Sequence, residues 1–330
     1  MAVGIKDVAR AANVSEATVS LALNGSPLVN EQTRQRIIKI AQSMNYTPNP
    51  YARQLVLKRS GVIGLVVPSI ENYYYATFVK HVNRAIRSTG YGLTISISEN
   101  DPENEAKIIQ EMINNRVEAL LLAPVNIPND QPDYLSLLID SEIPTIFVTS
   151  RYLVDGFSCV MCDLFGGMKT LIYYLNNRGY NNTLLLTGPQ GSYALDQRTE
   201  AALTAAKQLN LTRLDVVNLP DVTYEAVYES MEYIKTDEYD ALVCVNDMMA
   251  LAAYNSLTMR GLKVPQDIAI AGFDDVIFSQ ISPIPLTTVA QDIEGMAKTA
   301  TESALSLLQA KTATTLESIL PCKLVIRKST

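Results

Sequence analysis

The sequence predicts a small all-helical head at the N-terminus, followed by an α/β body built from two doubly wound parallel-sheet subdomains. Residues 1–45 show short helical periodicities separated by turn residues, whereas Val/Ile/Leu-rich runs alternate with amphipathic stretches from Gly61 onward. Such alternation is typical of a parallel sheet that is covered by helices on both faces. The body exceeds the length of one usual doubly wound unit, so two are expected.

Charge divides the chain at the same place. The whole chain has a net charge of −7, which by itself argues against a nucleic-acid partner. Residues 1–60, however, hold eight Lys or Arg and three Asp or Glu, a net +5, while the other 270 residues hold 19 and 31, a net −12. This asymmetry indicates that only the head meets a polyanion.

Two short helices open the head. Ile5, Val8 and Ala9 form one apolar face, and Asn13 tolerates the left-handed conformation that ends a helix. Ser15 is a good N-cap for a second helix, whose apolar face is Val19, Ala22 and Leu23. Two helices joined by a short turn are typical of the helix-turn-helix that reads DNA.

A third helix is expected to begin after Asn30, with apolar positions at Ile37, Ile38, Ala41 and Met44. A generic three-helix bundle would show the same periodicities. The basic composition of the head, and its place ahead of a body that looks like a ligand-binding unit, favour the DNA-reading interpretation.

The body is predicted from its alternating runs. Strands are expected at 61–67, 91–98, 118–124, 145–149, 157–162, 182–188, 214–219, 239–245 and 267–273. Helices are expected at 74–89, 103–115, 165–178, 195–209, 224–235 and 247–260.

Enzyme and metal chemistry are not expected. The chain has no G-x-S-x-G elbow, no Walker lysine loop and no H-E-x-x-H, and His81 is its only histidine. Cys159 and Cys162 form a C-x-x-C within an expected strand, where positions i and i+3 face opposite sides, so a buried structural role is favoured over a redox or metal pair. We therefore expect no catalytic residue, no metal and no cofactor.

The location and partners follow from similar observations. No apolar run reaches the ~18 residues of a membrane span, and the first residues lack the apolar core of a secretory signal. A cytoplasmic protein with no membrane partner is expected.

Several motifs in register resemble the lactose-repressor (LacI/GalR) family of bacterial transcription regulators. They are IKDVARAANVSEATVSLALNG, TRQRI, NYTPNPYARQL, IGLVVP, CVNDMMA, GLKVPQDIAIAGFDD and PLTTV, and they cover essentially the whole chain. The resemblance implies a periplasmic-binding-protein-like core behind the helix-turn-helix. It also implies a regulator, expected to be a repressor, that binds a palindromic double-stranded DNA operator as a homodimer under the control of a small-molecule effector, a sugar or related metabolite.

The family's DNA contacts transfer to matching positions of the head. The recognition helix would present Glu16, Ala17 and Leu21 to base edges, where Glu16 can accept from cytosine N4 and the other two can pack on thymine methyl groups. Many relatives carry Arg in place of Leu21, so a different operator base pair is expected there. Phosphate contacts would come from Ser15, Thr18, Ser20, Asn24, Thr33 and Tyr46.

The segment 49–57 matches the family's hinge helix. It is too short to be stable alone, so it should form only when packed on its dimer mate and on DNA. Asn49 and Ala52 would contact DNA, and Leu55 would wedge between base pairs in the minor groove. An ordinary linker contact is the alternative for Leu55.

The effector should bind in the crevice at the carboxyl ends of the strands. Arg198, Asn246 and Asp274 follow strands and match the family's effector contacts, and such a cation, amide and carboxylate suit a polyhydroxylated ligand. The three tyrosines 73–75 follow the first strand, where relatives carry paired aromatics. Many sugar-responsive relatives have Asp-Arg where this chain has Thr149, Ser150 and Arg151, so an oligosaccharide, a nucleoside or another metabolite stays possible.

These assignments divide the chain into three parts. Residues 1–47 form the helix-turn-helix domain, residues 48–60 the hinge helix and linker, and residues 61–330 the effector-binding core. Within the core, the N-subdomain is expected at about 61–161 plus 291–320 and the C-subdomain at about 162–290 plus 321–330. The end at LVIRKST carries no apolar heptads, which favours a dimer over a tetramer. A sugar-binding receptor without DNA function is the alternative.

Overall fold

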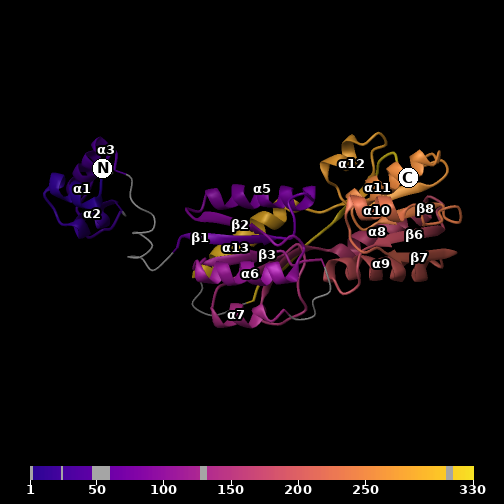
Figure 1. The fold of residues 1–330 in the computed structure, drawn as a ribbon, viewed down its shortest axis with the longest axis horizontal. Coiled ribbons are helices and arrows are strands. Elements are labelled where there is room, and N and C mark those ends of the chain that lie inside the picture. Colours follow the sequence, from indigo (N-terminus) through magenta and orange to yellow (C-terminus); the bar gives the residue numbers. More distant parts are fainter. Residues whose placement is uncertain (1–2, 24, 47–59, 127–131, 310–314) are drawn as a thin grey trace. The chain divides into compact units, whose positions relative to one another are not determined.

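The computed structural model describes residues 3–23, 25–46, 60–126, 132–309 and 315–330 (Figure 1). The chain divides into two compact units, Met1–Ser60 and Gly61–Thr330, and each is described by itself. The predicted fold class is confirmed, with a helical head followed by two parallel-sheet α/β subdomains. Among the described residues, no helix combines the length and apolar character that a membrane crossing requires.

The head contains three short helices, α1 (Ile5–Ala12), α2 (Glu16–Leu23) and α3 (Glu31–Ser43). The predicted caps are present. Asn13 ends α1 in the left-handed region (φ 50°), the Ser15 hydroxyl accepts from the Thr18 N–H at 3.1 Å, and the Asn30 side chain accepts from the Thr33 N–H at 2.8 Å. The helices enclose a core of Val8, Ala9, Ala12, Val19, Ala22, Val29, Ile37 and Ala41.

Two neighbouring isoleucines of α3 differ in burial. Ile37 is fully buried in this core, as predicted. Ile38, which the sequence also placed on the apolar face, is only half-buried and does not belong to the cluster. The reason is helix geometry, because adjacent positions lie about 100° apart around the axis.

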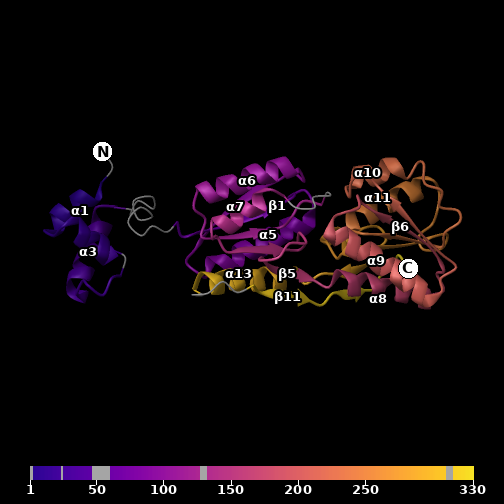
Figure 2. The ribbon, with the colours of Figure 1, turned by 90° about the horizontal axis from the view of Figure 1, so that it is seen from below.

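The first sheet of the body has the strand order β11-β5-β4-β3-β1-β2, and all its neighbours pair in parallel. Its strands are β1 (Val62–Val67), β2 (Gly92–Ile97), β3 (Ala119–Leu122), β4 (Thr145–Val148), β5 (Ser158–Cys162) and β11 (Glu317–Leu320). Its helices are α5 (Tyr73–Arg87), α6 (Pro102–Asn114), α7 (Tyr134–Asp140) and α13 (Ile293–Gln309). Helices α5 and α13 pack together on one face, and α6 and α7 on the other (Figure 2).

The second sheet repeats this arrangement with the order β12-β10-β9-β8-β6-β7, in which only β12 is antiparallel to its neighbour. Its strands are β6 (Asn182–Thr187), β7 (Arg213–Asn218), β8 (Ala241–Cys244), β9 (Ala269–Asp274), β10 (Thr287–Ala290) and β12 (Lys323–Val325). Its helices are α8 (Leu164–Asn177), α9 (Tyr193–Leu209), α10 (Tyr224–Ser230), α11 (Asp247–Met259) and α12 (Ile277–Ile281). In both sheets the strand order reverses beside the first strand, where such folds bind ligands.

The chain passes between the two sheets three times. It crosses after β5, after β10 and after β11, so β11 and α13 complete the first subdomain although they follow most of the second in sequence. These crossings also place the carboxyl ends of the strands of both sheets toward one shared cleft.

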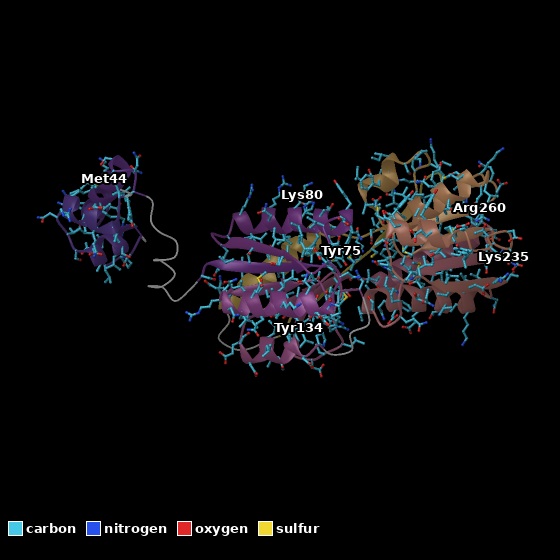
Figure 3. The ribbon with its side chains drawn as sticks, in the orientation of Figure 1. Met44, Tyr75, Lys80, Tyr134, Lys235 and Arg260 are labelled. Carbon is cyan, nitrogen blue, oxygen red and sulfur yellow. The ribbon has the colours of Figure 1, made fainter. Side chains whose placement is uncertain are left out.

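A buried carboxylate fixes one wall of this cleft. Glu105 on α6 is fully buried, and it accepts from the hydroxyls of Tyr134 and Tyr152 and from the Val125 N–H at 3.1 Å. Burial raises the pKa of this carboxyl, and the hydrogen bonds from these three donors lower it. Tyr134 is the first residue of α7 (Figure 3), and Val125 belongs to the segment that leads from β3 to Asn126. The Glu105 carboxylate on α6 therefore links α6, α7 and this segment.

Some sequence expectations need correction. The helix predicted over 224–235 ends at Ser230, because Met231 turns fully into the core and its carbonyl accepts from Arg260 at 3.3 Å. Helices α7, α12 and α13 and strands β10 to β12 were not predicted. His81, on α5, has its Nδ1 3.9 Å from a carboxylate oxygen of Glu294 on α13, and its side chain is 15% exposed.

The prediction for the C-x-x-C is confirmed. Cys159 and Cys162 are both buried in β5, and they belong to the hydrophobic clusters on opposite faces of the first sheet. Among the described residues, no group of three His, Cys, Asp or Glu side chains is arranged to hold a metal ion.

Candidate functional site

The second helix of the head separates a buried face from an exposed one. Val19 and Ala22 are buried in the core of the head, whereas Glu16, Ala17 and Leu21 are exposed. The exposed positions follow the spacing i, i+1, i+5, which places them on one side of a helix. These three side chains are therefore available to a major groove, as a recognition helix requires.

The predicted phosphate-contacting residues lie around this exposed face. Ser15 and Thr18 share a hydroxyl–hydroxyl hydrogen bond of 2.8 Å at the start of α2, and Ser20, Thr33 and Tyr46 are half-buried. The other predicted DNA contacts, Asn24, Asn49, Ala52 and Leu55, lie outside the described residues.

One of the eight basic residues of the head has a structural role. Arg34 donates to the carbonyls of Ser26 and Val29 at 2.8 and 3.1 Å and to the Glu31 carboxylate at 2.6 Å. It therefore holds the connection between α2 and α3, and because its partner Glu31 is already counted, this pairing leaves the net +5 of residues 1–60 unchanged.

In the body, predicted effector residues from five different segments of the chain meet. A small inner chamber of about 30 Å³ lies between the two sheets. Its lining contains six of the seven predicted effector residues, namely Tyr74, Tyr75, Thr149, Arg198, Asn246 and Asp274. Tyr73 does not line it; this ring is 39% exposed and packs edge-on against Phe278 at 5.5 Å between centroids.

Arg198 is the centre of the inner chamber. Its side chain projects from α9, is buried, and lies over the Phe273 ring with the guanidinium carbon 4.2 Å from the centroid. It donates to the Val245 carbonyl at 2.9 Å and to Asp274 Oδ1 at 3.3 Å. Its Nε has no hydrogen-bond partner among the described residues, so one donor is left for a ligand.

Asp274 is the carboxylate partner of this arginine. It also accepts from Gln291 Nε2 at 2.8 Å, and the Tyr74 hydroxyl donates to Gln291 Oε1 at 3.0 Å. Burial raises the pKa of Asp274 to about 6, and it would rise further without the Arg198 charge and the Gln291 hydrogen bond. Sequence reasoning missed Gln291, although it directly follows β10, where a polar residue at a strand end could have drawn notice.

A second buried acid positions the Asp274 loop. Asp247 is fully buried and accepts from the Val276 N–H at 2.8 Å and from the Thr288 hydroxyl at 2.6 Å. Burial and the nearby Asp274 raise its pKa well above the usual range. Its contact with Val276 holds Asp274 at φ 109°, an unusual conformation for a residue with a Cβ.

Thr149 and Asn246 complete the inner chamber differently. Thr149 has φ 65°, which is strained for a β-branched residue, and such strain concentrates at functional sites. Asn246 caps α11 by accepting from the Met249 N–H at 2.8 Å, and it donates to the Val222 carbonyl at 2.9 Å. Asn246 therefore caps α11 and lines the inner chamber at the same time.

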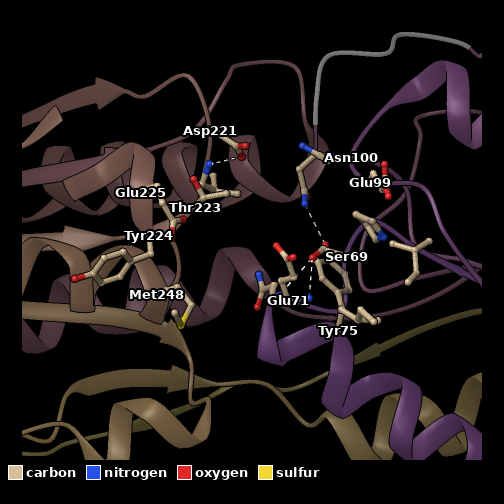
Figure 4. A pocket seen from close by; sticks show the side chains of 16 residues that line it. Ser69, Glu71, Tyr75, Glu99, Asn100, Asp221, Thr223, Tyr224, Glu225 and Met248 are labelled. Atoms are coloured by element: carbon tan, nitrogen blue, oxygen red, sulfur yellow. Dashed lines mark hydrogen bonds between the residues drawn. The ribbon is translucent and has the colours of Figure 1, made fainter. Parts of the chain in front are cut away.

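A larger outer chamber of about 600 Å³ opens beside the inner one (Figure 4). The two share Asn72, Tyr75, Asn126 and Val222, so they form one cleft. The outer chamber is lined by 68–72, Tyr75, Ile97, Glu99, Asn100, Asn126, 221–225 and Met248. Apart from Tyr75, sequence reasoning missed this lining, because it gathers loops and the ends of helices and strands that lie far apart in sequence.

Comparisons with known families agree with this architecture. The profile of a family described as "Bacterial regulatory proteins, lacI family" matches residues 4–49, and that of a "Periplasmic binding protein-like domain" matches residues 172–330.

Similar proteins extend over nearly the whole chain. The "Probable HTH-type transcriptional repressor ExuR" of Bacillus subtilis is 31% identical over 93% of this chain and 92% of its own length. The "Ribose operon repressor" of the same organism is 29% identical over 99% of this chain and 98% of its own. A crystal structure of the lac repressor dimer bound to operator and the anti-inducer ONPF has a TM-score of 0.87 at 25% identity, covering 100% of this chain and 99% of that one.

Proposed function

Because the chain belongs to the LacI family of bacterial regulatory proteins, we propose that this transcriptional regulator represses by binding an operator as a homodimer and is controlled by a small polyhydroxylated effector. The observation that carries the proposal is that one chain holds both parts of such a device. It has an exposed reading face on α2 and a cleft in which a cation, an amide and a carboxylate converge.

The head would supply DNA recognition. Glu16 would accept from a cytosine N4 amino group, and Ala17 and Leu21 would pack on thymine methyl groups. Ser15, Thr18, Ser20, Asn24, Thr33 and Tyr46 would set the register on the phosphates. We assign residues 1–47 to this task and residues 48–60 to a hinge in which Asn49, Ala52 and Leu55 meet the minor groove.

The core, residues 61–330, would sense the effector. The free Nε of Arg198 and the remaining acceptor capacity of Asp274 suit hydroxyl groups, since charge-assisted hydrogen bonds are the strong ones. A relative named for the ribose operon supports a sugar or related metabolite. Effector binding would close the cleft and shift the two subdomains, and this shift would decide whether the hinge helices can pack on DNA.

Location and mode of action follow from the partners. The relatives are transcriptional regulators, and we infer that this chain likewise acts by binding and not by catalysis. Its place of action would be the cytoplasm, where the operator lies.

Selection from a random duplex library tests the proposed function. Full-length protein should enrich two inverted half-sites, because a two-fold dimer presents the same reading helix twice. Enrichment of a single half-site would contradict the dimer, and absence of any enriched sequence would contradict operator recognition itself.

The dimer has a candidate surface on α12. Ile277, Phe278 and Ile281 are 38%, 41% and 67% exposed on this five-residue helix, and an exposed apolar group of this kind marks an interaction surface. We expect Ile281→Glu to weaken dimerisation at least about tenfold, because burying the new carboxylate in the interface costs about 1.4 kcal/mol or more.

Sedimentation velocity across a dilution series measures this effect. Ile139→Glu is the matched control, because Ile139 is 58% exposed but lies on α7 of the other subdomain. Equal dimer stability in both variants would show that α12 is not the interface.

A further inference from the structure

We propose that the outer chamber selects an effector with a protonated amino group, such as an amino sugar of two rings, and that Glu71, Glu99, Asp221 and Glu225 recognise its charge. The inference rests on the proposed function of the cleft as the effector site. It adds the chemical class of the ligand, which the inner chamber alone does not define.

The volume and the free polar atoms of the cleft point to a ligand. The outer chamber holds about 600 Å³, within the range of small-molecule sites, whereas the inner chamber of about 30 Å³ has room for about one water. Two buried polar atoms of residues that line the inner chamber lack a hydrogen-bond partner of normal geometry among the described residues. These atoms are Arg198 Nε and Thr149 Oγ1, and their residues are 8% and 5% exposed. The Thr149 side chain lies near the Tyr75 hydroxyl.

The charges of the outer chamber are all of one sign. Glu71 and Glu99 come from the loops after β1 and β2, whereas Asp221 precedes α10 and Glu225 lies in its first turn (Figure 4). The lining contains no lysine or arginine, and none of the four carboxylates makes an ion pair with a described residue. Asp221 accepts only from the backbone N–H of Val222, at 2.6 Å.

This distribution disfavours an anionic effector. The cation of the adjoining inner chamber, Arg198, is already paired with Asp274, so no free positive charge faces the cleft to receive a phosphate or a carboxylate. A uronate or a sugar phosphate would add a like charge beside four carboxylates, and like charges across a binding surface cost several kcal/mol.

Closure of the cleft gives the reason for a cation. Two of the carboxylates belong to the wall of the first sheet and two to the wall of the second, so closing brings like charges together and removes water from them. A neutral sugar offers hydroxyl donors but leaves this repulsion in place. A ligand ammonium between the walls compensates it, so a cationic ligand favours the closed state.

Calorimetric titration of the full-length chain tests the charge selection directly. The probes are the β-1,4-linked disaccharides of glucosamine, glucose and glucuronic acid, measured slightly below neutral pH so that the amines are protonated. We expect the glucosamine disaccharide to bind at least about tenfold more tightly than the glucose disaccharide, with no binding of the glucuronic acid disaccharide. Equal or tighter binding of the neutral or acidic probe, or no binding of any probe, would overturn the proposal.

A pair of double variants identifies the residues responsible. Glu71→Gln with Glu225→Gln should lower the preference for the cationic probe at least about threefold, because two of the four carboxylates lose their charge. Glu103→Gln with Glu229→Gln removes the same charge from exposed positions of the same two subdomains outside the chamber and should keep the full preference. An unchanged preference in the first double variant overturns the assignment of these carboxylates.

Operator affinity in the same samples separates this inference from the proposed function. If the glucosamine disaccharide binds as expected but operator affinity stays constant, charge selection stands and effector control fails. If another metabolite changes operator affinity while none of the three probes binds, effector control stands and charge selection fails.

Discussion

Replacing Ile37 with alanine is expected to abolish operator binding while leaving the effector-binding core folded. Ile37 is fully buried in the core of the head, and an Ile→Ala change at such a site costs about 2–5 kcal/mol. A core as small as that of the head supplies no more than about 3–5 kcal/mol. The head should therefore be largely unfolded, and operator affinity should fall by at least about a hundredfold.

Fluorescence anisotropy with operator DNA measures the loss of operator affinity, and calorimetric effector titration shows whether the core stays folded. Ile38→Ala is the matched control, since it removes the same atoms from the next, half-buried position outside the cluster. A comparable loss of operator affinity in both variants would show that packing of the head around Ile37 is not the cause.

Replacing Arg198 with alanine is expected to have the largest effect on the core. The change leaves Asp274 as a buried carboxylate without its ion-pair partner, which costs about 3–5 kcal/mol of unfolding free energy. It also removes the free Nε donor, so effector affinity should fall about 10- to 100-fold. Operator affinity without effector should stay within about threefold of the parent protein, because the head and core have separate hydrophobic cores.

This stability deficit should depend on pH in a defined direction. The pKa of Asp274 is already raised to about 6 by burial, and loss of the Arg198 charge raises it further. Protonation removes the unpaired charge, so the folded variant gains protons relative to the unfolded chain. The deficit should therefore be largest at alkaline pH and shrink as the pH falls toward about 6, the pKa of Asp274 in the parent protein.

Arg213→Ala is the matched control for these measurements. Arg213 also forms ion pairs, with Asp215 and Glu238, and lies 4.6 Å from the centroid of the Tyr239 ring, but its side chain is 39% exposed. An exposed pair contributes about 0–1 kcal/mol. Similar melting curves for the two variants would contradict the importance of the buried pair.

The fold could be predicted from the sequence where local pattern decides it. Asn13, Ser15 and Asn30 carry their capping chemistry in their own side chains, and buried parallel strands such as β6 and β9 are continuous apolar runs. The end of α10 could not be predicted, because it depends on a contact between Met231 and Arg260 that lie far apart in sequence. Long-range contacts override local propensity in such places.

The candidate site shows the same division. Arg198 and Asp274 could be predicted, because polar residues near the carboxyl ends of strands meet at one edge of a doubly wound fold. Tyr73 could not be separated from Tyr74 and Tyr75, since helix rotation turns adjacent side chains about 100° apart. The carboxylates of the outer chamber resembled solvated surface residues until the fold brought four of them around one cavity.

Salt-titrated binding of the full chain and of residues 61–330 to the DNA upstream of its own gene tests the central claim most directly. The full chain should bind with a logarithmic affinity that falls linearly with the logarithm of salt concentration, because the basic head displaces counterions from the phosphates. The acidic core should not bind at any salt concentration, although it still binds effector. Equal DNA affinity of the core and the full chain would contradict the assignment of operator recognition to the head.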